Sequence, residues 1–387
     1  MGTWRVDRRT FLGSLTLGLM ACGDKTPVRA DKAPVLAPGA KLERIAFASS
    51  ADQDAPQPFW PEIAAIQPDL FIFLGDAVYG DPMRDGEFVF DAAYLRSAYL
   101  KLSAIPEFDA FRKTVPIDAI WNDRDFGLSH SGADNPGKES ARDIFLKFWN
   151  VPPEDPRHSR DGVYFSRLIG APGRRVQLIF LDTRSFRSPL RPTDERGVKG
   201  KERWLPDDNP AKTLLGDAQW AWLEAQLRQP AELRIIASGI QVLAEGHGFE
   251  RWGTLPRERA RLLRLIDETG AGGVVFLSGD RQVAAHYRSE EARVPLYEAT
   301  SSGLNRTMPS AQERGPHQLG DVYGGENFGL LTIDWVEGTV LLDVRRTDGT
   351  LVRQTGVTLA KLASGAGEPG PDPAPGGGQA LPEIDNT

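Results

Sequence analysis

Four aspartates, Asp76, Asp123, Asp182 and Asp280, each stand at the end of a short apolar run. In open α/β sheets, ligands gather at the carboxyl ends of the strands. A single aspartate in such a place is usually a helix cap or a turn former. Four converging carboxylates would repel one another, and burial would increase the free-energy cost of keeping them charged. A bound cation would offset this cost. The spacing alone therefore leaves a metal site and a set of structural caps as equal alternatives.

Apolar runs that precede these aspartates alternate with helical patterns. Six runs are expected to form strands: residues 42–49, 69–74, 115–121, 175–181, 233–237 and 273–277. Five segments are expected to form helices: residues 60–66, 91–102, 138–149, 216–228 and 256–268. Alternation of this kind predicts an α/β fold.

Residues 295–359 have a different pattern and are expected to be mostly strand. Runs at 328–333, 339–345 and 351–359 are joined by Glu-Gly and Asp-Gly pairs, which favour hairpin turns. We expect four segments in the whole chain: a signal peptide (1–21), a polar tether (22–42), a folded domain (43–362) and a disordered Gly- and Pro-rich tail (363–387).

The first 21 residues are typical of an export signal. Arg8 and Arg9 form a twin-arginine pair, and residues 11–21 form an apolar segment too short to span a bilayer. Cys22 follows Leu-Met-Ala, as in a bacterial lipobox, although a lone cysteine is otherwise usually a buried thiol. We expect export by the twin-arginine route and lipid anchoring through Cys22. The protein would then lie at the periplasmic or extracytoplasmic face of a bacterial membrane.

Composition excludes several classes of function. The chain has 387 residues and a net charge of -7, so no nucleic-acid-binding patch is expected, because such a patch needs a basic face. With one cysteine, an internal disulfide, a thiolate zinc cluster and an iron–sulfur site are excluded. His130, His247 and His286 receive no role, because single histidines in loops are usually neither acids nor ligands.

Short pieces of the chain follow, in order and spacing, the pattern of a known family. They include Phe-Ala-Ser-Ser-Ala-Asp-Gln (47–53), Gly-Asp-Ala-Val-Tyr (75–79), Trp-Asn-Asp-Arg-Asp (121–125), Leu-Asp-Thr-Arg (181–184), Glu-Arg-Trp (250–252) and Leu-Ser-Gly-Asp-Arg-Gln (277–282). Over about residues 44 to 333, the chain resembles the PhoD-like alkaline phosphatase and phosphodiesterase family of calcineurin-like metallophosphoesterases. The resemblance implies a four-layer αββα sandwich of two mixed sheets. It also implies a two-metal site that activates water against a phosphate ester.

Ligand roles for Asp76, Tyr79, Asp123 and Asp280 follow from this resemblance. In the family pattern, the aspartate of Gly-Asp-x-x-Tyr bridges the metals and the tyrosine suits ferric iron; here they are Asp76 and Tyr79. A ring packed at the sheet edge is the alternative for Tyr79. One metal would take Asp76, Tyr79, a cysteine and a histidine. The other would take Asp76, Asp123, Asp280 and a residue near 238–241.

Several positions depart from the family pattern. Ser50 stands where the family has a cysteine ligand, and Ala77 stands where it has an asparagine. Asn122 replaces an acidic residue. Arg124 and Gln282 replace histidines. A serine hydroxyl and an amide oxygen are poor ligands for iron, so we expect the iron-type site to be lost. The remaining oxygen ligands would hold one divalent cation, Ca²⁺ or Mg²⁺ in preference to iron.

Two arginines near the strand ends have alternative interpretations. The guanidinium of Arg124 would either bind a phosphate in place of the missing cation or neutralise Asp76 or Asp280 in a salt bridge. The salt bridge is favoured, because orphan carboxylates need compensation. Arg184 follows Asp182 and is assigned to substrate binding, although arginines at such positions are often structural.

Two functions compete at this point. The first is hydrolysis of a phosphate mono- or diester, from a small molecule or the cell surface, with Asp76, Asp123 and Arg124 as catalytic residues. The second is a catalytically silent pseudophosphatase that binds an anionic ligand or a protein partner at the membrane face. Ser50, Arg124 and Gln282 favour this alternative. Losing half of a two-metal clamp costs many orders of magnitude in rate, so we expect reduced or absent activity.

Overall fold

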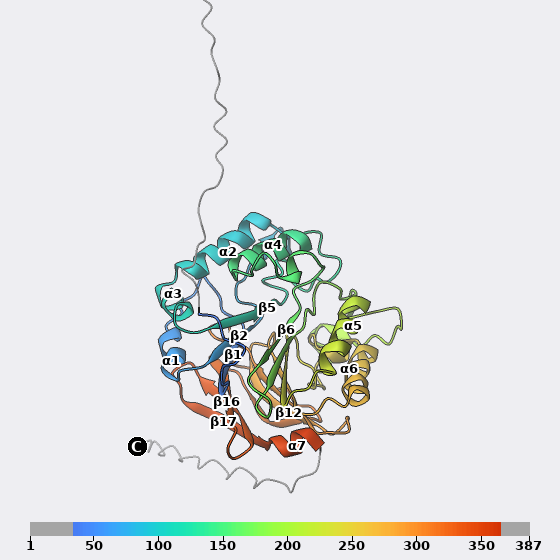
Figure 1. Ribbon diagram of the computed structural model, residues 1–387. Helices are drawn as coiled ribbons and strands as arrows, with labels where there is room; N and C mark the ends of the chain where they lie inside the picture. Colours follow the sequence, from blue (N-terminus) through green and yellow to red (C-terminus); the bar gives the residue numbers. More distant parts are fainter. Residues whose placement is uncertain (1–33, 365–387) are drawn as a thin grey trace, which may run out of the picture.

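The computed structural model describes residues 34–364. Two β-sheets lie face to face, and helices cover both outer sides (Figure 1). The predicted signal peptide, Cys22, most of the tether and all but the first two residues of the tail lie outside the described residues. Among residues 34–364, every helix is too short or too polar to cross a lipid bilayer.

The first sheet has six strands in the order β17-β16-β15-β1-β2-β5. β1, β2 and β5 are parallel, whereas β15, β16 and β17 join them through antiparallel pairings. The strand bounds are Arg44–Ala48 (β1), Leu70–Leu74 (β2), Ile117–Ile120 (β5), Asn327–Asp334 (β15), Thr339–Arg346 (β16) and Leu351–Thr358 (β17). The two predicted hairpins are present, and Gly338 and Gly349 in their turns have φ of 65° and 85°.

The second sheet has seven strands in the order β14-β12-β13-β11-β10-β7-β6. Its central strands β7, β10, β11 and β13 are parallel, and β6, β12 and β14 pair antiparallel. The strand bounds are Phe165–Ile169 (β6), Val176–Phe180 (β7), Leu233–Ser238 (β10), Val274–Ser278 (β11), Ala284–Ser289 (β12), Leu296–Ser301 (β13) and Gln318–Tyr323 (β14). β6 and β12 were not predicted, because β6 carries polar residues and β12 is interrupted by His286 and Arg288.

The helices divide between the two outer faces. Four pack against the first sheet: α1 (Trp60–Ala65), α2 (Ala92–Ala104), α3 (Pro106–Arg112) and α4 (Lys138–Phe148). Two cover the second sheet, α5 (Gly216–Leu227) and α6 (Pro256–Thr269), and α7 (Leu359–Ser364) follows β17. The strand predicted for residues 351–359 therefore ends at Thr358, because α7 begins at Leu359. α3 was not predicted, because Pro106 starts a new helix immediately after α2.

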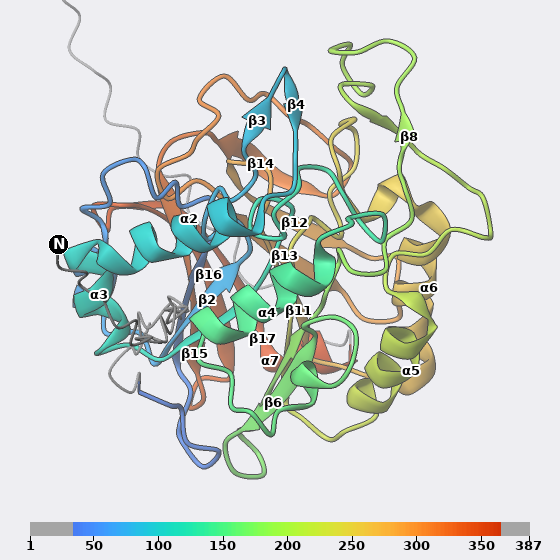
Figure 2. The same ribbon diagram turned by 90° about the horizontal axis from the view of Figure 1, so that it is seen from above.

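Short elements complete the described residues. They are the 3-10 turns Pro156–His158 and Trp252–Thr254, the hairpin β3 (Met83–Arg84) with β4 (Glu87–Phe88), and the pair β8 (Arg191–Pro192) with β9 (Trp204–Leu205). Figure 2 shows the β3–β4 hairpin and the segment around β8 projecting from the same side of the sandwich.

Apolar side chains fill the space between all four layers. Phe71 and Phe73 of β2 face the helices, while Leu70, Ile72 and Leu74 of the same strand face the second sheet. Strands buried on both faces read as continuous apolar runs, which is why the central strands were predicted well. The predicted four-layer αββα sandwich of two mixed sheets is confirmed.

Candidate metal centre

Three of the four strand-end aspartates converge in the structure. Asp76 follows β2, Asp123 follows β5 and Asp280 follows β11, so both sheets contribute at their carboxyl ends. One carboxylate oxygen from each residue lies within 4.8 Å of the others. Asp76 and Asp123 are buried. The structure thus brings together the three aspartates predicted to hold a metal.

Asp182 does not join this cluster. Its carboxylate accepts hydrogen bonds from Trp121 Nε1 and the Val163 N–H, both at 2.9 Å, and from the Ser185 hydroxyl at 2.7 Å. Asp182 is therefore a buried turn former, as the alternative interpretation described. The alternative in which all four aspartates meet at a metal does not hold for Asp182.

Sharp backbone turns at the ends of β2 and β11 bring the carboxylates together. Asp76 has a φ of 51° and Asp280 a φ of 73°, a left-handed conformation that residues other than glycine seldom adopt. Glycines precede both residues and permit close approach. A Cβ at Gly75 would lie 2.4 Å from the Asn122 Cβ, and one at Gly279 would lie 2.6 Å from a backbone oxygen of β2. Larger residues at these glycines would push the strand ends apart.

The negative charge of the cluster exceeds what the neighbouring side chains balance. Burial and the adjacent carboxylates raise the pKa of Asp76 well above its usual range and that of Asp280 to about 6. Burial also opposes ionisation of Asp123, but the charges of Arg184 and Arg124 outweigh it, and the pKa of Asp123 lies below its usual range. Asp76 and Asp280 are therefore protonated more easily than ordinary aspartates, and added positive charge would favour their ionised forms.

Asn122 lies among the three carboxylates. Its Nδ2 atom is 2.7 Å from Asp280 Oδ1, 3.3 Å from Asp76 Oδ2 and 3.4 Å from Asp123 Oδ1. A side-chain amide has only two N–H donors, so it cannot fully satisfy three acceptors. The family pattern has an acidic residue at this position. Asn122 instead directs its N–H groups toward the three carboxylates.

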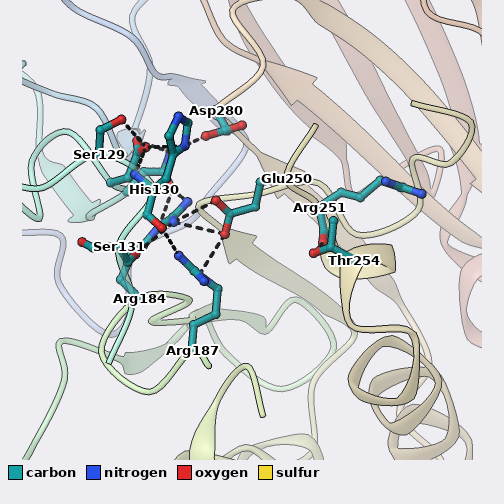
Figure 3. Close-up of polar contacts among 12 residues, drawn as sticks. Ser129, His130, Ser131, Arg184, Arg187, Glu250, Arg251, Thr254 and Asp280 are labelled. Carbon is teal, nitrogen blue, oxygen red and sulfur yellow. Dashed lines mark hydrogen bonds and ion pairs between the residues drawn. The ribbon is translucent and has the colours of Figure 1, made fainter. Parts of the chain in front are cut away.

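Arg184 is a support for Asn122 and not a contact for substrate. Its side chain is fully buried; Nε donates to Asn122 Oδ1 at 2.9 Å, and Nη1 donates to Glu250 at 3.0 Å. Glu250 lies between the guanidinium groups of Arg184 and Arg187 (Figure 3), with Arg187 Nε at 3.0 Å. The assignment of Arg184 to substrate binding is therefore wrong. Glu250 received no role from the sequence, although its Glu-Arg-Trp piece was part of the family pattern.

The positions that the resemblance gave to an iron-type site hydrogen-bond to one another. The Ser50 and Ser302 hydroxyls are 2.9 Å apart, and the Gln282 N–H donates to Ser302 Oγ at 2.8 Å. Gln282 Nε2 donates to the Tyr79 hydroxyl at 3.2 Å. Burial, and then the charge of Asp76, raise the pKa of Tyr79, so its phenol stays protonated. We refer to Ser50, Ser302, Gln282 and Tyr79 as the neutral chain.

Arg124 forms a salt bridge, but with a partner that the sequence did not indicate. Its Nη1 atom lies 2.8 Å from Asp81 Oδ2, while its backbone N–H donates to Asp76 Oδ1 at 3.2 Å. The predicted partners Asp76 and Asp280 are therefore wrong for the guanidinium. The guanidinium also lies over the rings of Tyr79 and Phe88, at 5.4 and 4.7 Å from their centroids. Its side chain remains 21% exposed, so it is accessible from solvent.

His130 and Ala77 also lie beside the cluster. The His130 N–H donates to Asp123 Oδ2 at 2.8 Å, and its Nδ1 lies 3.4 Å from the same oxygen. Sequence reasoning gave His130 no role, because its loop position carries no signal of this contact. Ala77, which stands for the family's asparagine, is buried and offers a methyl group in place of an amide.

Comparison with known proteins places the chain in a family. A family model described as PhoD-like phosphatase matches residues 46–319. The chain belongs to the PhoD-like phosphatase family. A solved structure of PhoD matches with a TM-score of 0.62 and 17% sequence identity, covering 84% of this chain and 70% of that chain. This likeness shows the common fold. No curated protein matches the chain.

The described residues fit one cation position of a PhoD-like metallophosphatase better than two. Asp76, Asp123 and Asp280 offer carboxylate oxygens close together, and burial and the neighbouring carboxylates still raise the pKa of Asp76 and Asp280 despite nearby arginines, which suits a hard divalent cation. The neutral chain does not fit an iron-type ligand set. It presents two hydroxyls, an amide and a protonated phenol where such a site needs thiolate, imidazole and tyrosinate.

Proposed function

We propose that the protein hydrolyses phosphate esters with a single divalent cation, Ca²⁺ or Mg²⁺, at Asp76, Asp123 and Asp280. The observation that carries this proposal is the set of three converging carboxylates within 4.8 Å of one another. Their crowding leaves excess negative charge that a cation would offset. Iron is disfavoured, because every candidate ligand atom is an oxygen of a carboxylate.

The residues around the cluster hold the three carboxylates in place. A bound cation would supply an activated water and stabilise the charge that develops on the phosphate. The His130 N–H and the Ser129 hydroxyl fix Asp123 Oδ2, at 2.8 and 3.3 Å. The Arg124 N–H fixes Asp76 Oδ1, which leaves Asp76 Oδ2 directed toward the cluster.

Arg124 holds the phosphate in this proposal. A guanidinium carries five N–H donors in a rigid fork, and Asp81 takes one of them. The rings of Tyr79 and Phe88 fix the plane of the fork, so the remaining donors are positioned before substrate arrives. The substrate would be a small phosphate ester or a phosphodiester of the cell surface.

A second candidate function rests on the neutral chain. Its hydroxyl, amide and phenol groups satisfy one another where a second metal would otherwise contribute to catalysis. A protein with this arrangement could bind an anionic ligand or a partner at the membrane face without turnover. Fold alone does not separate the two candidates.

Hydrolysis assays separate the two candidates. The full-length protein is incubated with p-nitrophenyl phosphate and with its bis ester, with Ca²⁺, Mg²⁺, Mn²⁺ or Fe added in turn. Cation-dependent turnover that Asp76→Ala abolishes is expected and would exclude the pseudophosphatase. No turnover with any cation, together with turnover in a Ser50→Cys, Arg124→His, Gln282→His triple variant, would overturn the proposed activity.

The cellular location is proposed from the sequence signals alone. Arg8 and Arg9 would direct twin-arginine export, and lipidated Cys22 would anchor the mature protein at the periplasmic or extracytoplasmic face. Cell fractionation tests both steps. Replacing Arg8 and Arg9 by Lys should retain the protein in the cytoplasm, and Cys22→Ala should release it from the membrane fraction.

A further inference from the structure

The orientation of the Asn122 amide is fixed by Arg184. Its Oδ1 atom accepts from Arg184 Nε at 2.9 Å and also from Arg184 Nη2. The oxygen and nitrogen of an amide are normally assigned from their hydrogen bonds, and here only the oxygen can accept from a guanidinium. The Nδ2 atom must therefore face Asp76, Asp123 and Asp280.

With the amide in this orientation, the Asn122 oxygen is not available as a cation ligand. The amide N–H groups also compete with a cation for the carboxylate oxygens. Turned the other way, the amide would present an oxygen that Ca²⁺ and Mg²⁺ readily accept. As it stands, its N–H groups occupy Asp280 Oδ1 at 2.7 Å and approach one oxygen each of Asp76 and Asp123. A cation must compete with these donors for the same oxygens.

Arg184 itself has little freedom to move. It is fully buried, and its Nη1 atom donates to both oxygens of Glu250, which is also buried. Arg187 pairs with the same carboxylate but makes no contact with Asn122 among the described residues. Turning the amide would leave two buried guanidinium N–H groups without an acceptor, which is costly.

We propose that Arg184 and Asn122 together set how tightly the aspartate cluster binds a divalent cation, by holding the amide N–H groups toward the carboxylates. The inference rests on the cation site of the proposed function. It goes beyond that function, because it assigns the control of cation affinity to two buried residues that do not bind the cation themselves.

Calcium titration of arginine variants tests the orientation separately from charge. The full-length protein is stripped with EDTA and titrated with CaCl2 by isothermal calorimetry. Arg184→Lys keeps the positive charge but loses the two-donor fork, so the amide is free to turn. We expect Ca²⁺ affinity to rise about 10-fold, the usual size of effects from residues behind metal ligands. Arg187→Lys, the matched change on the other side of Glu250, should leave affinity within about 2-fold of wild type.

Substitution of the amide tests the same inference from the other partner. Asn122→Asp keeps an acceptor for Arg184 and presents an anionic oxygen to the cluster, so we expect Ca²⁺ to bind at least about 10-fold tighter. Asn209→Asp adds the same charge at an exposed position and should change nothing. In the double variant Asn122→Asp, Arg184→Lys, the lysine should add no further affinity, because no amide remains to turn.

The outcomes separate this inference from the proposed function. Calcium binding by the wild type with unchanged affinity in both Arg184→Lys and Asn122→Asp overturns the inference and leaves the cation site intact. No calcium binding in the wild type or in any variant overturns both. Binding that appears only in the variants supports the inference. Circular dichroism reports folding, and Arg184→Lys keeps the test decisive if Asn122→Asp does not fold.

Discussion

The Nδ2 atom of Asn122 lies 2.7 Å from Oδ1 of Asp280, a contact that joins residues 158 positions apart and links the two sheets at their carboxyl ends. Carboxylates from the ends of both sheets meet at this point. Here a neutral amide makes part of that link. The two N–H donors of the amide cannot satisfy three carboxylates. Without a cation, repulsion among the buried carboxylates therefore destabilises the fold at this point.

Removing one carboxylate should therefore stabilise the cation-free protein. The folded-state pKa of Asp280 is about 6, above its ordinary value, so its charge at pH 7 opposes folding. Asp280→Asn should raise the free energy of unfolding by about 1–3 kcal/mol in EDTA. It should also abolish Ca²⁺ binding. Urea unfolding and calorimetric titration measure the two effects.

Asp182→Asn is the matched control for this prediction. Asp182 also ends a strand and is also buried, but its oxygens accept several hydrogen bonds from the chain. An amide in that place would direct N–H groups at other donors and should cost about 1–3 kcal/mol of stability. If both variants lose stability equally, the aspartate cluster is not crowded in the way described.

Glu250 should be among the most sensitive positions of the chain. It lies between two buried guanidinium groups, at 3.0 Å from both Arg184 and Arg187 (Figure 3). Glu250→Ala would remove the carboxylate that two buried guanidinium groups share, and breaking a buried ion pair in this way costs about 3–5 kcal/mol. Chemical denaturation should record this as a lower midpoint. Glu224→Gln, which breaks an exposed ion pair with Arg228, should cost less than about 1 kcal/mol.

Arg124 should contribute to substrate binding in addition to its salt bridge with the buried Asp81. Arg124→Leu should raise KM for p-nitrophenyl phosphate about 10-fold or more, because a charged hydrogen bond to phosphate is lost. Arg306 also lies over the Tyr79 ring, at 5.2 Å from its centroid, but it is 56% exposed and pairs with Asp52. Arg306→Leu should therefore leave KM near the wild-type value. Equal KM values for both variants would remove Arg124 from the proposed phosphate site.

Much of the fold could be predicted from the sequence, because its central strands are buried on both faces. Runs such as residues 70–74 carry apolar side chains at every position, and turns such as Gly338 carry their own conformational signal. Edge and mixed strands, among them β6 and β12, lack that pattern. The short helix α3 was hidden, because its proline looked like the end of α2.

The candidate site could be predicted only in part. Asp76, Asp123 and Asp280 could be found, because strand ends of both sheets meet at one edge. Which charges lie beside them depends on contacts between distant segments. Asp81 faces Arg124 across 43 residues, and Glu250 faces Arg184 across 66. Such pairings follow from the packing of loops, which leaves no local pattern in the sequence.

His286 should make the stability of the protein depend on pH. It lies in β12, is fully buried, and its Nδ1 atom is 2.9 Å from the Thr355 hydroxyl in β17, so it joins the two sheets. Burial, followed by the charge of Arg353, lowers the pKa of His286 to about 3. The unfolded chain takes up a proton near pH 6.5, whereas the folded protein resists it until about pH 3. The stability that depends on an uncharged His286 is therefore fully present above pH 6.5. Below that pH, this contribution to the free energy of unfolding falls by about 1.4 kcal/mol per pH unit.

Urea unfolding at a series of pH values between 7 and 4 measures this loss. His286→Gln should unfold at lower urea at neutral pH, because a buried ring is lost, but its stability should fall less steeply as the solution is acidified. His158→Gln, which removes an exposed ring, serves as the control and should keep the wild-type slope. A His286→Gln protein with the same slope as wild type would mean that other groups account for the acid sensitivity.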